Sequence, residues 1–138
     1  MQVQPYLFFD GRAEEAIEFY KSTLGAEVEM LMRFKENPDA DTAGMNLPPG
    51  SENKVMHACF KVGDTQVMAS DGMCGGKPGF QGFSLSLTVP TEVAADKTFA
   101  ALAKDGQVQM PLGKTFFAPK FGVVADKFGV SWMIIAAS

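Results

Sequence analysis

The chain contains a single histidine, His57, and imidazole is the side chain best suited to acid or base chemistry at neutral pH. It lies in residues 55–62, where apolar side chains recur at every second position, as in a half-buried strand. His57 is therefore a candidate catalytic and ligand-binding residue. The alternative is a histidine that only hydrogen-bonds a neighbouring strand or loop. The alternation places Met56, Ala58, Phe60 and Val62 on the core face, and His57, Cys59 and Lys61 on the other.

Cys59 shares the predicted face of His57 and is a second candidate ligand-binding residue. A cysteine reacts as the thiolate, and the sequence places no base or helix end beside Cys59. A small buried hydrophobe is therefore the competing interpretation. The other cysteine is Cys74. Because the first residues do not read as an export signal, we expect both to be free thiols in a reducing cytoplasm.

Methionine and phenylalanine form a second group of candidates, with 9 and 12 residues respectively. Thioethers adapt to irregular shapes and pack well on aromatic rings, so a cup lined by them would accept a flat or apolar molecule. The same residues would serve equally well as an ordinary core. The ligand-binding candidates of this group are Met68, Phe117, Phe121 and Met133.

One glycine-rich segment, residues 72–78, is excluded as a phosphate-binding loop. Only three residues separate Gly72 from Gly76, and Pro78 stands where a Ser or Thr would hold Mg²⁺. We interpret the segment as a flexible linker between two parts of the chain.

The composition limits the partners of the chain. Its 138 residues are 46% hydrophobic and 20% charged, which is enough for a substantial core without a disulfide framework. With a net charge of −4 and no run of Lys or Arg, it has no basic surface for nucleic acid or an anionic membrane. The longest mostly apolar stretch, residues 130–137, is far shorter than the about 20 residues of a membrane-spanning helix. We expect a cytoplasmic protein whose partner is an unknown small molecule or another chain.

The elements that must position these residues occur twice. In the first half, a strand candidate at 3–9 precedes a helix whose apolar stripe runs from Ala13 to Leu24, followed by strand candidates at 28–34, 55–62 and 65–70. Asp10 or Gly11 is the predicted cap at the start of this helix, and Gly25 fits the position just after its end.

The same order returns in the second half. A strand candidate at 83–89 precedes a helix with Thr91 as its cap and Gly106 closing it, followed by residues 108–110, 121–125 and 130–136. We therefore predict an α+β fold with a βαβββ module at 1–72, a glycine-rich linker at 73–81 and a second module at 82–138. The polar loop 35–54 lacks a counterpart of similar length, and such loops often form lids.

Three groups of residues carry a family resemblance that covers nearly the whole chain. They are residues 5–11 with Phe19-Tyr20 and Leu24-Gly25, residues 56–58 with 68–71, and Phe121-Gly122 with residues 126–133. With the repeat, they resemble the vicinal oxygen chelate superfamily of glyoxalases, extradiol dioxygenases and antibiotic-resistance proteins, and its PhnB-like branch in particular. The resemblance implies tandem modules that form a curved mixed sheet, a glyoxalase-like cup, and a homodimer.

The resemblance also implies where a metal would bind. In the enzymes of this superfamily, His and Glu residues from the first and last strands of each module hold a divalent metal. The matching positions fall near Pro5, Met68 and Met133, and within residues 83–85, and none is His, Asp or Glu. Thioethers are poor ligands for Zn²⁺, Mn²⁺ or Fe²⁺. We expect no metal and no cofactor. A runner-up metal site would recruit His57 with Asp71 or a loop carboxylate.

Two functional hypotheses follow. The leading one is a metal-independent PhnB-like protein that binds a small, partly apolar molecule in its cup. The alternative is a metal-dependent or His57-assisted isomerase, lyase or dioxygenase, and a purely structural or interaction role is a third possibility. Some PhnB-like relatives are labelled as similar to demethylubiquinone methyltransferase. We do not expect methyl transfer, because the sequence has no glycine-rich strand-to-helix turn to bind a methyl donor.

Overall fold

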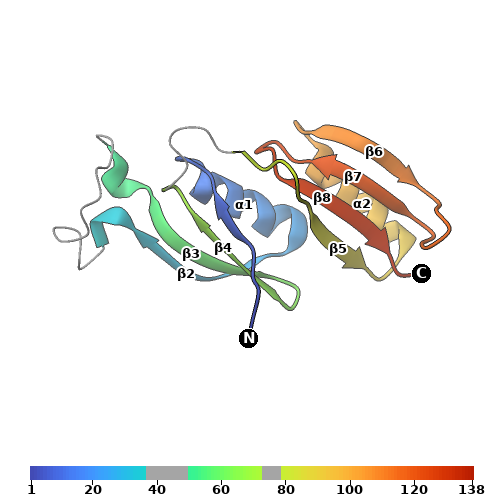
Figure 1. Cartoon of the computed structure of the whole chain (residues 1–138), viewed down its shortest axis with the longest axis horizontal. Coiled ribbons are helices and arrows are strands. Elements are labelled where there is room, and N and C mark those ends of the chain that lie inside the picture. The colour runs from blue at the N-terminus through green and yellow to red at the C-terminus, as the bar shows by residue number, and fades with distance from the viewer. Residues whose placement is uncertain (37–49, 73–78) are drawn as a thin grey trace. The chain divides into compact units, whose positions relative to one another are not determined.

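The computed structural model describes residues 1–36, 50–72 and 79–138 (Figure 1). The chain divides into two compact units, Met1–Pro78 and Gly79–Ser138. Each unit is a four-stranded mixed sheet with one helix packed on it, which confirms the predicted α+β class and the repeat. Cys74, most of the predicted linker and most of the predicted lid loop lie outside the described residues. No helix in the described part of the chain has the length and apolar character needed to cross a membrane.

The first unit is built from one helix and four strands in the order strand, helix, strand, strand, strand. In the sheet the order is β1-β4-β3-β2, with β1 parallel to β4 and the other neighbours antiparallel. The elements are β1 (Tyr6–Phe8), α1 (Ala13–Leu24), β2 (Glu27–Arg33), β3 (Val55–Val62) and β4 (Thr65–Ser70). Short 3-10 helices at Phe34–Glu36 and Ser51–Asn53 flank the segment between β2 and β3.

The core of the first unit lies between its sheet and α1. Tyr20 of α1 is fully buried, and its ring stacks on Phe60 of β3 with the centroids 5.9 Å apart. Leu7 and Ala69 pair directly and are also buried, so β1 and β4 turn the same face toward the core. The predicted core face of residues 55–62 is therefore confirmed for Ala58, Phe60 and Val62, whereas Met56 is only half-buried.

The start of α1 is capped in a way that the sequence analysis did not predict. Neither Asp10 nor Gly11 is the cap, because Arg12 occupies that position and makes no side-chain cap hydrogen bond. Instead Oδ1 of Asp71, just after β4, accepts the N–H groups of Gly11 and Ala13 at 2.7 and 2.8 Å. Its Oδ2 accepts the N–H of Val55 at 2.9 Å. One carboxylate thus joins the start of α1 to β3 and β4.

The second unit repeats this arrangement with the sheet order β5-β8-β7-β6. Thr91 caps its helix as predicted, with Oγ1 accepting the N–H of Ala94 at 3.1 Å. Gly106 does not close this helix, because the helix ends at Ala103 and Lys104 is its extended C-cap. A Cβ at Gly106 would overlap the carbonyl oxygen of Ala125, so the glycine permits a close backbone approach. The elements are β5 (Leu85–Val89), α2 (Glu92–Ala103), β6 (Gln107–Gly113), β7 (Phe121–Ala125) and β8 (Ser131–Ala136).

A buried carboxylate closes the turn between β7 and β8. Asp126 is 3% exposed, and its Oδ1 accepts the N–H groups of Phe128 and Val130 at 2.9 and 3.1 Å. Its Oδ2 accepts the indole N–H of Trp132 at 3.0 Å. Three donors therefore compensate for the loss of water around this charge.

Candidate functional site

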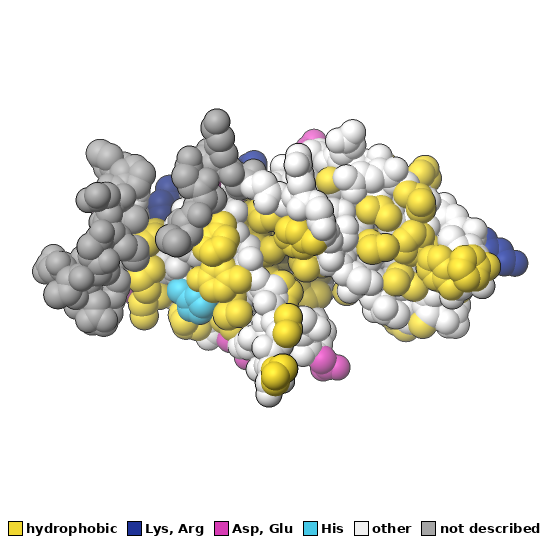
Figure 2. Space-filling model, viewed as in Figure 1, with side chains coloured by type: hydrophobic (Ala, Val, Ile, Leu, Met, Phe, Trp, Pro, Cys, Tyr) yellow, Lys and Arg dark blue, Asp and Glu magenta, His cyan; other side chains and the backbone are white. Residues whose placement is uncertain are grey.

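His57 lies on the face of the first sheet opposite α1, which we call the His57 face. Directly paired residues on neighbouring strands point to the same side of a sheet. One row of pairs crosses all four strands, from Tyr6 through Met68 and Cys59 to Met30. Figure 2 shows the histidine among hydrophobic side chains. We use the name for the part of this face formed by Tyr6, Phe8, Met30, Met32, His57, Cys59, Met68 and Ser70, beyond which the paired Lys61 and Gln66 continue the same side of the sheet.

The second sheet has an equivalent row on the face opposite α2. It runs from Ser86 through Met133 and Val123 to Met110. Both rows end at a methionine of an edge strand, Met30 in β2 and Met110 in β6. In each strand the pairing register shifts just before this methionine, between Val28 and Met30 and between Val108 and Met110. The two faces therefore have the same backbone pairing but different side chains.

The six candidate ligand-binding residues form two groups of three, one in each unit. His57, Cys59 and Met68 lie together on the His57 face, where Cys59 pairs directly with Met68. Phe121 and Met133 share the face of the second sheet, because Met133 pairs with Val123, two residues along β7 from Phe121. The ring of Phe117 lies 5.1 Å from that of Phe121, centroid to centroid. Each unit thus brings three candidates together.

The sequence analysis missed the partner of His57. The hydroxyl oxygen of Tyr6 lies 2.8 Å from Nδ1 of His57, at hydrogen-bond distance, and the two ring centroids are 5.5 Å apart. Burial raises the pKa of Tyr6, and a side-chain hydrogen bond with Ser70 lowers it by less. The phenol is therefore protonated at neutral pH. The available signal was the alternation in β1, where Leu7 faces the core and Tyr6 does not.

Cys59 packs within the sheet and does not meet the conditions for a nucleophile. It is 7% exposed and has no disulfide partner. Its Sγ lies 3.7 Å from Oε1 of Glu29. Burial and the nearby Glu29 carboxylate both raise the pKa of the Cys59 thiol, so the thiolate is disfavoured.

The residues at the superfamily's metal positions do not fit a divalent metal. The direct partner of Met68 is Tyr6, one residue beyond the predicted Pro5, and the partner of Met133 is Ser86, one residue beyond the predicted range 83–85. None of these four paired residues is His, Asp or Glu. Among the described residues, no group of three or more His, Cys, Asp or Glu side chains is placed to hold a metal.

The runner-up metal site also lacks a free carboxylate at Asp71. Both of its oxygens accept backbone N–H groups, as described for the start of α1. Binding a metal there would require these hydrogen bonds to break, and two of them cap the helix.

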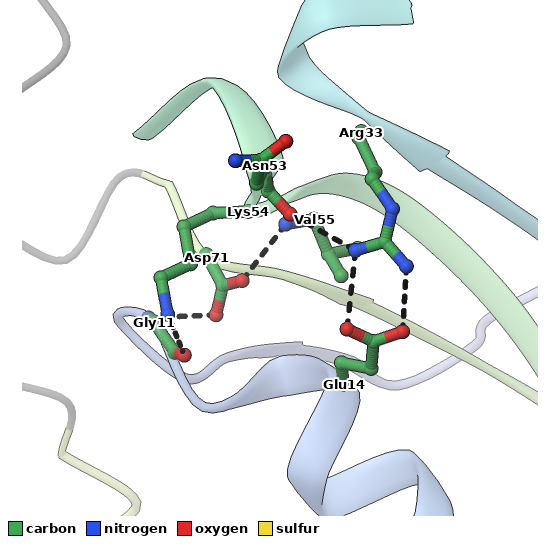
Figure 3. A pocket seen from close by; sticks show the side chains of 7 residues that line it. All are labelled: Gly11, Glu14, Arg33, Asn53, Lys54, Val55 and Asp71. Carbon is green, nitrogen blue, oxygen red and sulfur yellow. Dashed lines mark hydrogen bonds and ion pairs between the residues drawn. The ribbon is translucent and has the colours of Figure 1, made fainter. Parts of the chain in front are cut away.

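A separate polar cavity of about 370 Å³ lies at the start of α1 (Figure 3). Arg33 donates to both carboxylate oxygens of Glu14, at 3.1 and 2.6 Å, and to the carbonyl of Asn53 at 2.9 Å. The hydrogen bonds from Arg33 lower the pKa of Glu14. Lys54 donates to the Gly11 carbonyl at 3.1 Å. The lining residues are Gly11, Glu14, Arg33, Asn53, Lys54, Val55 and Asp71.

The charged side chains of this cavity are already paired within the first unit. Its two cations and two carboxylates each have a partner, and the contacts join α1, β2 and the residues before β3. We therefore take the His57 face, with its polar pair in apolar surroundings, as the candidate functional site.

Comparison with known proteins agrees with this architecture. A family model described as 3-demethylubiquinone-9 3-methyltransferase matches residues 1–135. The chain is 38% identical over 138 residues to Protein YjdN of Escherichia coli, covering 97% of this chain and 94% of that protein. A solved structure described as a putative 3-demethylubiquinone-9 3-methyltransferase, PhnB protein, from Bacillus cereus is 35% identical, with a TM-score of 0.81 and coverage of 99% and 100%.

The fold also extends to a more distant protein. A glyoxalase-related enzyme from Fulvimarina pelagi superimposes with a TM-score of 0.59 at 17% identity, covering 99% of this chain and 88% of that one. At this identity the likeness concerns the fold alone, and it agrees with a glyoxalase-like arrangement of paired βαβββ modules.

Proposed function

Because the chain belongs to the PhnB-like family described as 3-demethylubiquinone-9 3-methyltransferase, within the vicinal oxygen chelate superfamily, we propose that it binds a small, partly apolar molecule on its His57 face without a divalent metal. The observation that carries this proposal is the Tyr6–His57 hydrogen bond, set among methionine and phenylalanine side chains. A few polar groups in an apolar surface are typical of small-molecule sites, where they fix the orientation of the ligand.

The apolar part of the face is available for contact. Met30 is 40% exposed and Tyr6 is 37% exposed, and the ring of Phe8 stacks on that of Tyr6 with centroids 5.0 Å apart. Flexible thioethers beside rigid aromatic rings adapt to ligands of irregular shape. The metal-independent form of the proposal is supported by Tyr6, Met68 and their counterparts in the second unit, which are unsuitable ligands for Zn²⁺, Mn²⁺ or Fe²⁺.

A His57-assisted isomerase or lyase is the second candidate function. It is favoured by the same hydrogen bond, since an imidazole held by a tyrosine is oriented for proton transfer to a bound molecule. Methyl transfer is not proposed for this chain. The two strand-to-helix turns, residues 9–12 and 90–91, contain one glycine between them, so neither is a glycine-rich cofactor loop.

A ligand screen tests the binding proposal. Protein labelled with ¹³C at the methionine methyl groups is screened against metabolites and aromatic compounds by thermal shift, and each hit is mapped by NMR. We expect hits to move the methyl signals of Met30, Met32 and Met68. We expect His57→Ala to weaken the binding of these hits. Phe116→Ala is the matched control, because this fully exposed ring lies in the second unit. Hits that leave all three methyl signals in place would contradict the proposal.

Metal content tests the metal-independent form. Protein purified without an affinity tag is assayed by plasma mass spectrometry before and after chelation. We expect substoichiometric divalent metal and an unchanged melting temperature. A stoichiometric ion whose removal lowers stability would refute this form and would favour the metal-dependent alternative.

We also propose that the chain forms a homodimer. Strands β2 and β6 lie at the edges of their own sheets, and both carry apolar side chains that are 39–48% exposed. Such edges are normally covered or blocked in soluble proteins. A monomer mass by light scattering at micromolar concentration would contradict the proposal. The cytoplasmic location and the module boundaries at 72 and 82 stay predictions.

A further inference from the structure

We infer that the His57 face selects molecules in which a hydrogen-bond-accepting oxygen, such as a carbonyl or carboxylate oxygen, is attached to an apolar body, and that Tyr6 is the positioning residue that sets this preference. The inference rests on the proposed function, because it names the chemical class of ligand for the same face. It follows from the direction of the hydrogen bond between Tyr6 and His57.

The hydrogen bond between Tyr6 and His57 joins a phenol and an imidazole whose atoms lie 2.8 Å apart. A phenol is a strong donor and a weak acceptor, because the lone pair of its oxygen is delocalised into the ring, whereas the unprotonated nitrogen of a neutral imidazole is a strong acceptor. Donation from the phenol to the imidazole is therefore the favoured direction.

This direction fixes the proton of the imidazole. The protonated phenol of Tyr6 donates its hydrogen to Nδ1 of His57. A neutral imidazole has one N–H, so when Nδ1 accepts a hydrogen bond the proton is on Nε2. Tyr6 thereby fixes the tautomer of His57, and Nε2 becomes a hydrogen-bond donor.

When a bound molecule displaces water from His57, the donor at Nε2 needs an acceptor from that molecule. Within the described residues Nε2 has no hydrogen-bond partner, and the half-buried His57 lies beside Met32, whose thioether is only a weak acceptor. A ligand with a carbonyl or carboxylate oxygen satisfies this N–H, whereas a hydrocarbon of the same shape leaves it unpaired. We expect the oxygen to tighten binding about five- to tenfold.

Two probes of nearly identical shape test the inference. Acetophenone and ethylbenzene share a ring and a two-carbon substituent and differ in the carbonyl group. Each is titrated into the full chain, labelled with ¹⁵N in the histidine ring and ¹³C at the methionine methyl groups. We expect both probes to shift the methyl signals of Met32 and Met68. Acetophenone is expected to bind about five- to tenfold more tightly and to shift Nε2 more than Nδ1 of His57.

Two variants separate the role of Tyr6 from general effects of mutation. Tyr6→Phe keeps the ring but removes the hydroxyl, so both tautomers of His57 become populated and the preference for acetophenone falls by about half, because only the tautomer with its proton on Nε2 donates to the carbonyl. Ser86→Ala is the matched control, because it removes a hydroxyl from the corresponding position of the second sheet. It is expected to leave the ¹⁵N spectrum of His57 and the probe preference unchanged.

The possible failures are distinguishable. Equal affinities for the two probes, with the methyl signals shifted, would overturn the inference and leave the proposed function standing. A ¹⁵N spectrum with the proton on Nδ1, or a full preference in Tyr6→Phe, would also overturn it. If neither probe shifts the methyl signals, both the inference and the proposed function fail.

Discussion

Replacing Asp71 by alanine tests whether its carboxylate is a structural link or is available for a metal. In the folded chain this carboxylate accepts three backbone N–H groups, two at the start of α1 and one at Val55 in β3. All three contacts are partly buried, so water replaces them only in part. We expect Asp71→Ala to destabilise the fold without changing the ligand preference of the His57 face.

The magnitude follows from these contacts. Loss of a helix cap costs about 0.5–2 kcal/mol, and a hydrogen bond to a charged group contributes about 1.5–3 kcal/mol. We therefore expect Asp71→Ala to lower the free energy of unfolding by about 3 kcal/mol. Asp71→Asn keeps one oxygen for the two cap contacts and turns its amide toward the N–H of Val55. We expect it to lose about half as much.

The assay is urea unfolding followed by far-ultraviolet circular dichroism. Asp64→Ala is the matched control, since Asp64 is exposed in the turn between β3 and β4, and it should change the free energy of unfolding by less than about 0.5 kcal/mol. A loss below about 1 kcal/mol in Asp71→Ala would refute the reasoning. Stabilisation of the natural chain by Zn²⁺, abolished in Asp71→Asn, would instead support the runner-up metal site.

Two further predictions concern other parts of the fold. A Cβ at Gly122 would lie 2.8 Å from the ring of Phe99 and 3.1 Å from Cα of Leu112. Gly122→Ala should therefore lower the free energy of unfolding by about 1–3 kcal/mol in the urea assay. An unchanged free energy of unfolding would contradict this, because it would mean that Phe99 and α2 move aside at little cost. Arg33 lowers the pKa of Glu14 below its ordinary value of 4.5, so this contribution to stability is present above pH 4.5 and is lost as the pH falls through the lower folded pKa. Glu14→Gln should reduce the acid dependence of the melting temperature, and an unaltered pH profile would contradict this.

The order of the elements was predictable because each is encoded by a local pattern. Strands β3, β4 and β7 occupy the residues that apolar alternation predicted, and Thr91 caps α2 as its position before an amphipathic segment indicated. Gly106 shows the limit of such reasoning. Glycine occurs both at helix ends and where two backbone segments approach closely, and the sequence does not distinguish the two cases. Only the contact with Ala125 identifies Gly106 as the second case.

The candidate site was predicted in part. Alternation placed His57 and Cys59 on one face, and Met68 joins them there. The partner at Tyr6 was missed because β4 lies between β1 and β3, so the contact depends on the strand order and not on any local pattern. The cap at Asp71 was missed for the same reason, since its carboxylate accepts hydrogen bonds from residues up to 60 positions away in the sequence.

The indole held by Asp126 belongs to the only tryptophan of the chain, and it lies in the second of the two repeats. Its fluorescence therefore reports on one repeat, while circular dichroism reports on both. Coincident transitions by the two methods would mean that the repeats unfold as one cooperative body. Separate transitions would give each repeat its own stability, measured on the unmodified chain and without an added label.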